Sequence, residues 1–222
     1  MKKSHKAAMI ALSLGFALVG YTKNKDAKQT LLNAVHQQDL HAVKKLIRLG
    51  ENLDQHNDRG RTPLMIATYN NDIEIAKVLI SNGADVNIPD DMQNTPFLYA
   101  AAEGYWDILK LTTKAGADPN ITNRYGNTAL ISAAEHGNVE ALHWLLNETK
   151  VDVNHINNLG WTALLEAIIL GDGSKNYQQC VQLLLQHKAN PNIADKDDVT
   201  PIEHAEKLGY KEIEYLLKKY GY

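Results

Sequence analysis

Short apolar runs alternate with polar turns along most of this chain. Ile73, Ala76, Leu79 and Ile80 are spaced so that they form one stripe on a helix, and the residues from Leu64 to Thr68 form a second helical pattern just before them. Polar segments rich in Gly, Asn and Asp separate such patterns. The chain is therefore predicted to form many short helices that are arranged in pairs.

The pattern repeats with a fixed period. A Thr-initiated tripeptide returns at intervals of 33, 33, 34 and 38 residues, and a second marker, Asp-Val-Asn or a close variant, returns at 33, 34 and 38. The tripeptides begin at Thr62, Thr95, Thr128, Thr162 and Thr200, and the second markers begin at Asp85, Asp118, Asp152 and Asn190. A degenerate earlier copy begins at Gln29. Six units are expected, at residues 29–61, 62–94, 95–127, 128–161, 162–199 and 200–222.

These markers resemble the ankyrin repeat, through the period of 33 and the T-P-L…A…G-A-D-V-N pattern. The resemblance covers residues 29–222. It implies an all-α fold in which each repeat contributes a β-turn and two antiparallel helices to a curved solenoid. A single unit buries too little apolar surface to fold alone, so the first and last units are expected to act as caps.

The residues themselves predict how each unit begins and ends. Thr62 can cap the first helix, and Pro63 suits the first helical position because its missing N–H would be unpaired there. Gly50, Gly83 and Gly116 follow second helices, where a left-handed residue ends a helix. The Asn of each second marker, such as Asn87, is expected to bond nearby backbone in the turn.

Three features depart from the family pattern. The His that usually follows T-P-L is replaced, and we expect apolar contacts in place of its hydrogen bonds. The replacements are Met65, Leu98, Ile131, Leu165 and Glu203. Repeat four has one extra residue within 148–151, where a Gly is missing. Repeat five has about five extra residues around 171–175, which are either a partner-specific protrusion or a tolerated loop insertion.

The first twenty residues form a separate segment. Lys2, Lys3 and Lys6 precede fourteen residues without charge, a pattern typical of a secretory signal peptide and too short to span a bilayer. A buried N-terminal helix is the alternative. We expect residues 1–20 to be removed, 21–28 to be a linker, and the protein to be periplasmic or secreted. Tyr21 stands where a lipoprotein would have Cys, so no lipid anchor and no stable membrane insertion is expected.

Charge and cysteine content narrow the function classes. The net charge of −3 gives no basis for nucleic-acid binding, and loss of three lysines with residues 1–20 makes it −6, which favours a basic protein partner. The single Cys180 excludes an intrachain disulfide and is expected to be a small buried thiol. We expect a monomer.

No catalytic, cofactor or metal site is predicted. The nine histidines do not pair with Cys or carboxylates at metal-ligand spacing. Asp172-Gly173-Ser174 lacks the spaced acids and the closing Glu of a calcium loop. No glycine-rich phosphate-binding motif is present, and an enzyme is the least favoured class of function.

The resemblance implies that binding uses the concave surface, which the turn tips and the exposed side of each first helix form. Arg, Tyr, Trp and Met are enriched at interface hot spots, and large side chains recur at successive tips. The predicted binding residues are Arg59, Arg61, Tyr69, Met92, Arg124, Tyr125, His136, Leu159 and Trp161. Trp161 has an alternative role, which is packing against the adjacent tip.

Two kinds of binding function fit this sequence. One is a module of the bacterial cell envelope that regulates or neutralises a partner protein, either as an immunity protein against a toxin or as an accessory factor for an envelope enzyme. The other is a secreted effector that acts on host proteins.

Overall fold

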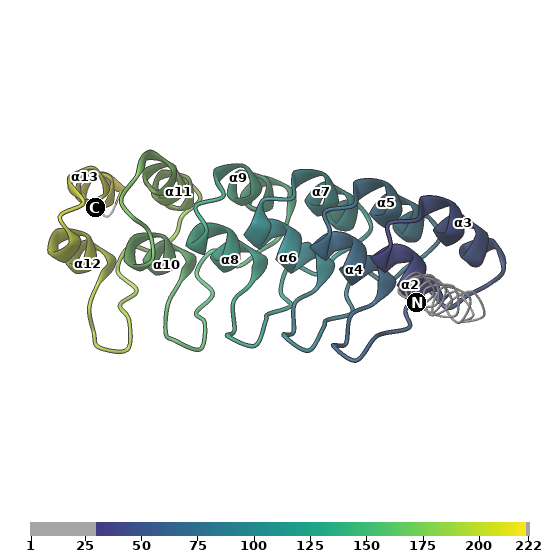
Figure 1. The fold of residues 1–222 in the computed structure, drawn as a ribbon. Helices are drawn as coiled ribbons and strands as arrows, with labels where there is room; N and C mark the ends of the chain where they lie inside the picture. Colours follow the sequence, from purple (N-terminus) through teal and green to yellow (C-terminus); the bar gives the residue numbers. More distant parts are fainter. Residues whose placement is uncertain (1–29, 221–222) are drawn as a thin grey trace, which may run out of the picture.

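The computed structural model describes residues 30–220 as one elongated row of paired helices with no β-strand in that range (Figure 1). The helices nearest the loops form an inner row, and their partners form an outer row. The inner helices are α2 (Leu31–His36), α4 (Pro63–Tyr69), α6 (Pro96–Glu103), α8 (Ala129–Glu135), α10 (Ala163–Ile169) and α12 (Pro201–Leu208). The outer helices are α3 (Leu40–Arg48), α5 (Ile73–Ser81), α7 (Trp106–Lys114), α9 (Val139–Glu148), α11 (Lys175–Gln186) and α13 (Lys211–Tyr220).

This arrangement confirms the predicted all-α solenoid. Each pair lies within one of the expected repeats, and the expected signal segment and linker lie outside the described residues. Within the described range, no helix is both long and apolar enough to cross a membrane.

The inner helices begin as predicted. In five of them a threonine hydroxyl accepts a hydrogen bond from the backbone N–H three residues on, which satisfies a donor that the helix cannot pair itself; in α2 this residue is Thr30, at 3.2 Å. In the other four helices the distances are 3.1 Å at Thr62, 3.2 Å at Thr95, 3.4 Å at Thr128 and 3.3 Å at Thr162. Pro63, Pro96 and Pro201 occupy the first turn of their helices.

The predicted helix stops are also confirmed. Gly50, Gly83 and Gly116 follow outer helices with positive φ angles of 80°, 92° and 88°. In repeat four, where this glycine is missing, α9 ends at Glu148 and the extended Thr149 follows it. The side chains of Asn87 and Asn154 bond the next repeat rather than their own turn, because each accepts at 2.8 Å from a backbone N–H of the following unit, at Asp118 and Asn190. They therefore help to fix one repeat against the next.

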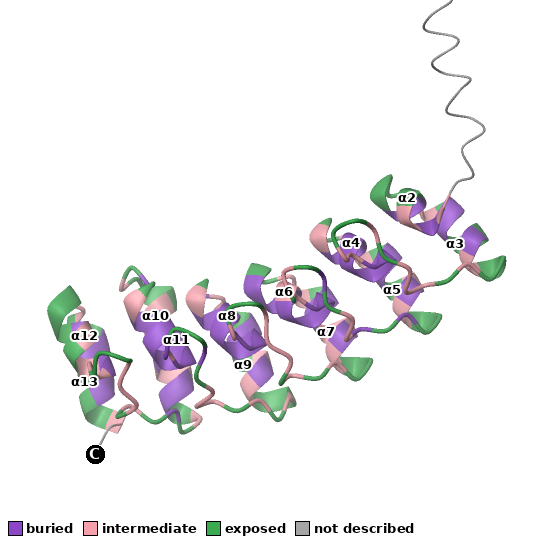
Figure 2. Cartoon of the chain, turned by 90° about the horizontal axis from the view of Figure 1, so that it is seen from below, coloured by how far each residue is buried: buried purple, intermediate pink, exposed green. Residues whose placement is uncertain are grey.

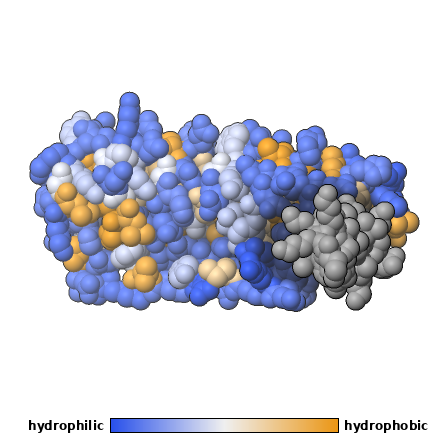
Figure 3. Space-filling view, viewed as in Figure 1, coloured by the Kyte–Doolittle hydropathy of each residue, from blue (hydrophilic) through white to orange (hydrophobic). Residues whose placement is uncertain are grey.

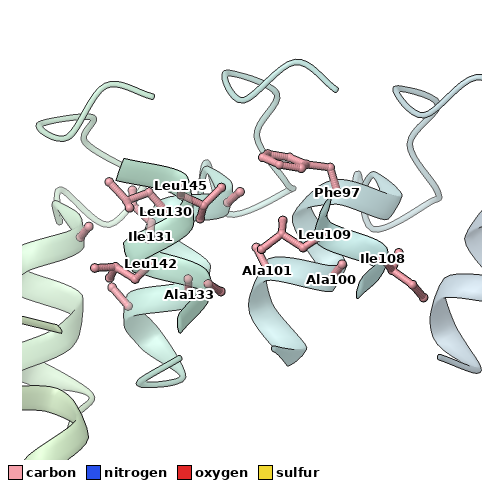
Figure 4. Packing of buried hydrophobic residues seen from close by; sticks show 14 of the residues in the cluster. Phe97, Ala100, Ala101, Ile108, Leu109, Leu130, Ile131, Ala133, Leu142 and Leu145 are labelled. Atoms are coloured by element: carbon pink, nitrogen blue, oxygen red, sulfur yellow. The ribbon is translucent and has the colours of Figure 1, made fainter. Parts of the chain in front are cut away.

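The core lies between the helices of each pair and between neighbouring pairs (Figures 2 and 4). The recurring alanines of the inner helices are fully buried, which allows close helix approach; these are Ala67, Ala100, Ala133 and Ala167. Met65, Leu98, Ile131 and Leu165, which replace the family histidine, are buried too. The expectation of an apolar contact is wrong for Glu203, which is exposed and bonds the Thr200 backbone N–H at 2.8 Å in a capping box.

The extra residues of repeat five are fixed between their neighbours. The Tyr177 hydroxyl donates to the Glu135 carbonyl at 3.0 Å, and the Tyr210 hydroxyl donates to the Gly171 carbonyl at 2.9 Å. Gly171 is buried, and a Cβ there would lie 2.2 Å from the Ala167 carbonyl oxygen. Part of the insertion also lengthens α11 to twelve residues. Cys180 on this helix is fully buried, and burial raises its pKa to about 12, as expected for an inert thiol.

Replacement of Leu165 tests the apolar substitution of the family histidine. Leu165→Ala should lower the free energy of unfolding by about 2–5 kcal/mol in urea denaturation, because the fully buried side chain leaves a cavity. Leu170→Ala is the matched control, since Leu170 follows the same helix and is half exposed, and it should change stability by less than about 0.5 kcal/mol. Equal losses in both variants would contradict this account of the core.

Candidate protein-binding surface

A repeated side-chain interaction shapes each loop tip. One Asn or Asp in every hairpin uses its Oδ1 to accept two backbone N–H groups, two and four residues further on, at 2.9–3.1 Å. These residues are Asn57, Asp90, Asn123, Asn157 and Asp195, and they recur at the same intervals as the threonines. Sequence analysis missed them, although this spacing would have revealed them. They hold every tip in the same conformation.

Backbone hydrogen bonds also join adjacent tips. The carbonyls of Arg59, Met92 and Tyr125 accept from the N–H groups of Asp91, Arg124 and Asn158 at 3.1, 3.1 and 3.0 Å. Because the tips are tied through their main chains, the side chains at these positions remain available to project from an ordered edge.

Three of the predicted residues meet at neighbouring tips. The Arg124 guanidinium Nη1 lies 2.7 Å from the Met92 sulfur, and its carbon lies 5.5 Å from the centre of the Tyr125 ring. Tyr125 is 52% exposed. Exposed aromatic and guanidinium groups held this way form a preorganised contact area.

Three more predicted residues, Arg59, Arg61 and Tyr69, line one cavity of about 510 Å³ at the first tip. The Arg61 guanidinium stacks 3.6 Å from the centre of the Tyr69 ring, and the Tyr69 hydroxyl donates to Asp90 Oδ2 at 2.9 Å. Burial and the neighbouring Asp90 raise the pKa of Tyr69. The Tyr99 ring extends this cluster, since its centre lies 4.1 Å from that of Tyr69, and burial raises its pKa to about 12. Sequence analysis did not identify Asp90 or Tyr99, whose roles depend on contacts between repeats.

The remaining predicted residues lie in other surroundings. Leu159 is 51% exposed at its tip, whereas Trp161 is half-buried and its backbone closes the hairpin through Asn157. His136 follows α8, where its Nδ1 lies 2.9 Å from the Ser132 carbonyl oxygen of its own helix. Leu170, which follows α10, and Leu208, the last residue of α12, are both exposed and add apolar surface at these two helices. In Figure 3, orange surface gathers over the part of the molecule where Figure 1 places α10 and α12.

Two carboxyl groups stand beside each other in the middle of the array. Glu166 is 1% exposed, and its Oε1 accepts from Asn157 Nδ2 at 2.7 Å, while its Oε2 has no hydrogen-bond partner within residues 30–220. Asn127 connects this pair to the other carboxyl, because its Oδ1 accepts from Asn157 at 2.8 Å and its Nδ2 donates to Glu135 at 3.3 Å. Burial, and then the charge of Glu135, raise the pKa of Glu166 to about 7. This network was also absent from the sequence predictions.

A separate hollow of about 600 Å³ lies on the outer helices. Trp106, Val139, His143 and Leu183 line it together with polar residues of α11. In the part of the chain that the structure describes, no group of three or more His, Cys, Asp or Glu side chains is placed to hold a metal ion.

Most of the chain matches one protein family. A model that describes ankyrin repeats in three copies matches residues 5–90, 31–123 and 97–195. This chain belongs to the ankyrin repeat family. Ankyrin repeats are modules for protein–protein interaction and are generally not catalytic.

Two solved structures resemble this chain over most of its length, and two curated proteins resemble it over about a third of its length. A crystal structure of an ankyrin repeat domain from Acinetobacter baumannii AYE is 52% identical with a TM-score of 0.83, and the match covers 86% of this chain and 97% of that one. A second solved ankyrin repeat protein is 41% identical with the same TM-score and coverage. The putative ankyrin repeat protein YahD of Escherichia coli K12 is 47% identical over 81 residues, 36% of this chain and 40% of YahD. Human BCL-6 corepressor-like protein 1 is 33% identical over 85 residues, 38% of this chain and 4% of that protein. The matches thus span less than half of these two curated relatives.

Glu166 makes the stability of the array depend on pH. The pKa of Glu166 in the folded chain is about 7, above the ordinary value of 4.5, so the folded state holds this proton more tightly than the unfolded state. The stabilisation from protonated Glu166 is therefore complete below pH 4.5 and is lost as pH rises to 7. Glu166→Gln keeps an acceptor for Asn157 but cannot ionise. Relative to the wild type, the free energy of unfolding of the variant should rise by roughly 3 kcal/mol between pH 4.5 and 8 in urea denaturation, because folding raises the pKa of Glu166 from 4.5 to about 7. Parallel stability curves for the two proteins would contradict the raised pKa.

Proposed function

We propose that this chain is a non-catalytic module of the bacterial cell envelope that binds one partner protein and regulates or neutralises it. The observation that carries the proposal is the row of tips: five Asn or Asp side chains fix the hairpins, and large side chains project between them. Large exposed side chains such as Arg124 and Tyr125, held in place at neighbouring tips, are typical of a protein-binding surface.

The envelope location rests on the sequence of the first twenty residues. A basic start followed by fourteen uncharged residues supports export through a cleaved signal peptide. Similarity to an Acinetobacter domain is in keeping with a bacterial source. Two roles fit the proposal, an immunity protein that occupies a toxin and an accessory factor that supports an envelope enzyme. A toxin gene or an enzyme gene beside its own would separate them.

The interaction is tested with two tyrosines of similar exposure. Tyr125 is 52% exposed at a tip, and Tyr215 is 57% exposed on α13. The partner is first isolated from envelope extracts with the wild-type chain as bait and then titrated by calorimetry. Tyr125→Ala should weaken binding about tenfold or more, because hot-spot aromatics contribute this much to interfaces. Tyr215→Ala should bind like the wild type.

Both variants should unfold at almost the same temperature as the wild type, since neither side chain is in the core. Equal loss of affinity in both variants would contradict a tip-centred interface. A large fall in the unfolding temperature of Tyr125→Ala would instead assign this residue to the core.

Cleavage of the proposed signal peptide can be tested separately. The protein recovered from the source bacterium should have a mass that lacks residues 1–20 and should carry no acyl group, as read by intact-protein mass spectrometry of the periplasmic fraction. A chain that retains Met1 and fractionates with the cytosol would remove the envelope from the proposal and leave the binding function in place.

A further inference from the structure

The cavity at the first tip combines charged and amide side chains with an apolar wall. Arg59, Arg61 and Asn57 line it, and Leu32 and Ile66 provide an apolar wall. Charged and amide donors thus face a hollow of about 510 Å³ that is large enough for one side chain and its neighbours.

Asn57 supplies a donor whose direction is fixed. Its Oδ1 accepts from the N–H groups of Arg59 and Arg61 at 2.9 and 3.1 Å, so its amide nitrogen must be the free end of the group. Among the described residues this nitrogen has no partner.

The equivalent atoms of three other tips are occupied. Asp90 Oδ2 accepts from Tyr69, Asn157 Nδ2 donates to Glu166, and Asp195 Oδ2 lies 2.7 Å from His204 Nε2. At these three tips the second side-chain atom of the Asn or Asp contacts another residue of the chain, whereas the Asn57 amide nitrogen remains available to donate to a ligand. Asn123 also keeps a free amide nitrogen within the described part of the chain, but it does not line this cavity.

The two arginines complete a set of donors. The Arg59 residue is exposed, and its guanidinium makes no hydrogen bond or ion pair with any residue in the range 30–220, although its backbone N–H and carbonyl are bonded. The Arg61 guanidinium carbon lies over the Tyr69 ring, and its Nε lies 3.7 Å from Asp90 Oδ2 and has no hydrogen-bond partner among the described residues. A stacked guanidinium loses little rotamer entropy on binding, which favours planar recognition of a carboxylate.

We propose that this cavity binds the carboxylate of a Glu or Asp side chain that the partner protein presents, with Asn57, Arg59 and Arg61 as donors. The inference rests on the proposed binding function and names the chemistry of one contact. Asp90 and Asp58 offset part of the arginine charge, which suits a singly charged carboxylate better than a doubly charged phosphate. The overall negative charge of the chain does not oppose it, since screening leaves mainly the nearby charges effective.

The test uses a pair of substitutions that the chain itself makes possible. Asn57→Asp keeps the Oδ1 that closes the hairpin, as Asp90 and Asp195 do in their own repeats, and replaces the donor nitrogen by a negative oxygen. Asn123→Asp makes the same change at a tip outside the cavity. Both variants should fold like the wild type, judged by thermal unfolding.

The probes are two capped peptides, acetyl-Gly-Leu-Glu-Leu-Gly-amide and the same peptide with Gln in place of Glu, titrated into the full chain and followed by NMR. The Glu peptide should give saturable shifts of the Asn57 side-chain NH₂ and the Arg59 Nε–H, and it should bind about tenfold or more tightly than the Gln peptide. Asn57→Asp should abolish these shifts, and Asn123→Asp should leave them unchanged.

Several results would overturn the inference. They are equal binding of the two peptides, unchanged binding by Asn57→Asp, or tighter binding of inorganic phosphate than of the Glu peptide. A partner that binds wild type and Asn57→Asp equally would also remove this contact while leaving the proposed function intact. Conversely, peptide binding without any captured partner would leave the carboxylate site in place and remove the proposed function.

Discussion

Stacking of neighbouring repeats is the constraint on which the rest of the structure depends. A pair of helices of six to twelve residues cannot bury a core of its own, so the apolar face of each pair is covered by the next pair. Fully buried alanines at one position in four successive inner helices allow that approach. The loops are spaced like the helix pairs that they connect. The backbone of one tip can therefore bond the next tip, and the side chains between them form a continuous surface.

The fold could be predicted because its determinants are local and repeated. Thr62 and its equivalents cap helices through contacts three residues away, and Gly83 ends a helix by its own φ angle. Such features appear in the sequence once per repeat. The exceptions come from context: Glu203 occupies a position that is buried in repeats two to five, but as an exposed residue it caps its own helix. The conformation of the extra residues of repeat five also depends on a residue far along the chain, because Tyr210 bonds the Gly171 carbonyl. The spacing of the repeats could not show this contact.

The candidate surface could be predicted only in part. Exposed tip residues such as Tyr125 and Leu159 are recognisable, since a turn does not require a large side chain. Contacts between repeats are not recognisable in the same way, because Asp90 meets Tyr69 and Asn157 meets Asn127 across about twenty to thirty residues of sequence. The closing Asn and Asp residues were missed for a different reason, since they look like ordinary turn residues until their shared spacing is examined.

The central claim is that a partner covers the tips and the inner helices rather than the hollow on the outer helices. Hydroxyl-radical footprinting of the complex tests this most directly, because it reports the solvent access of individual side chains. The account predicts that partner binding lowers the oxidation of Met92, Tyr125 and Leu159 and leaves Trp106, His143 and Tyr215 unchanged. Protection of Trp106 and His143 with unchanged oxidation at the tips would contradict it and would assign binding to the outer face.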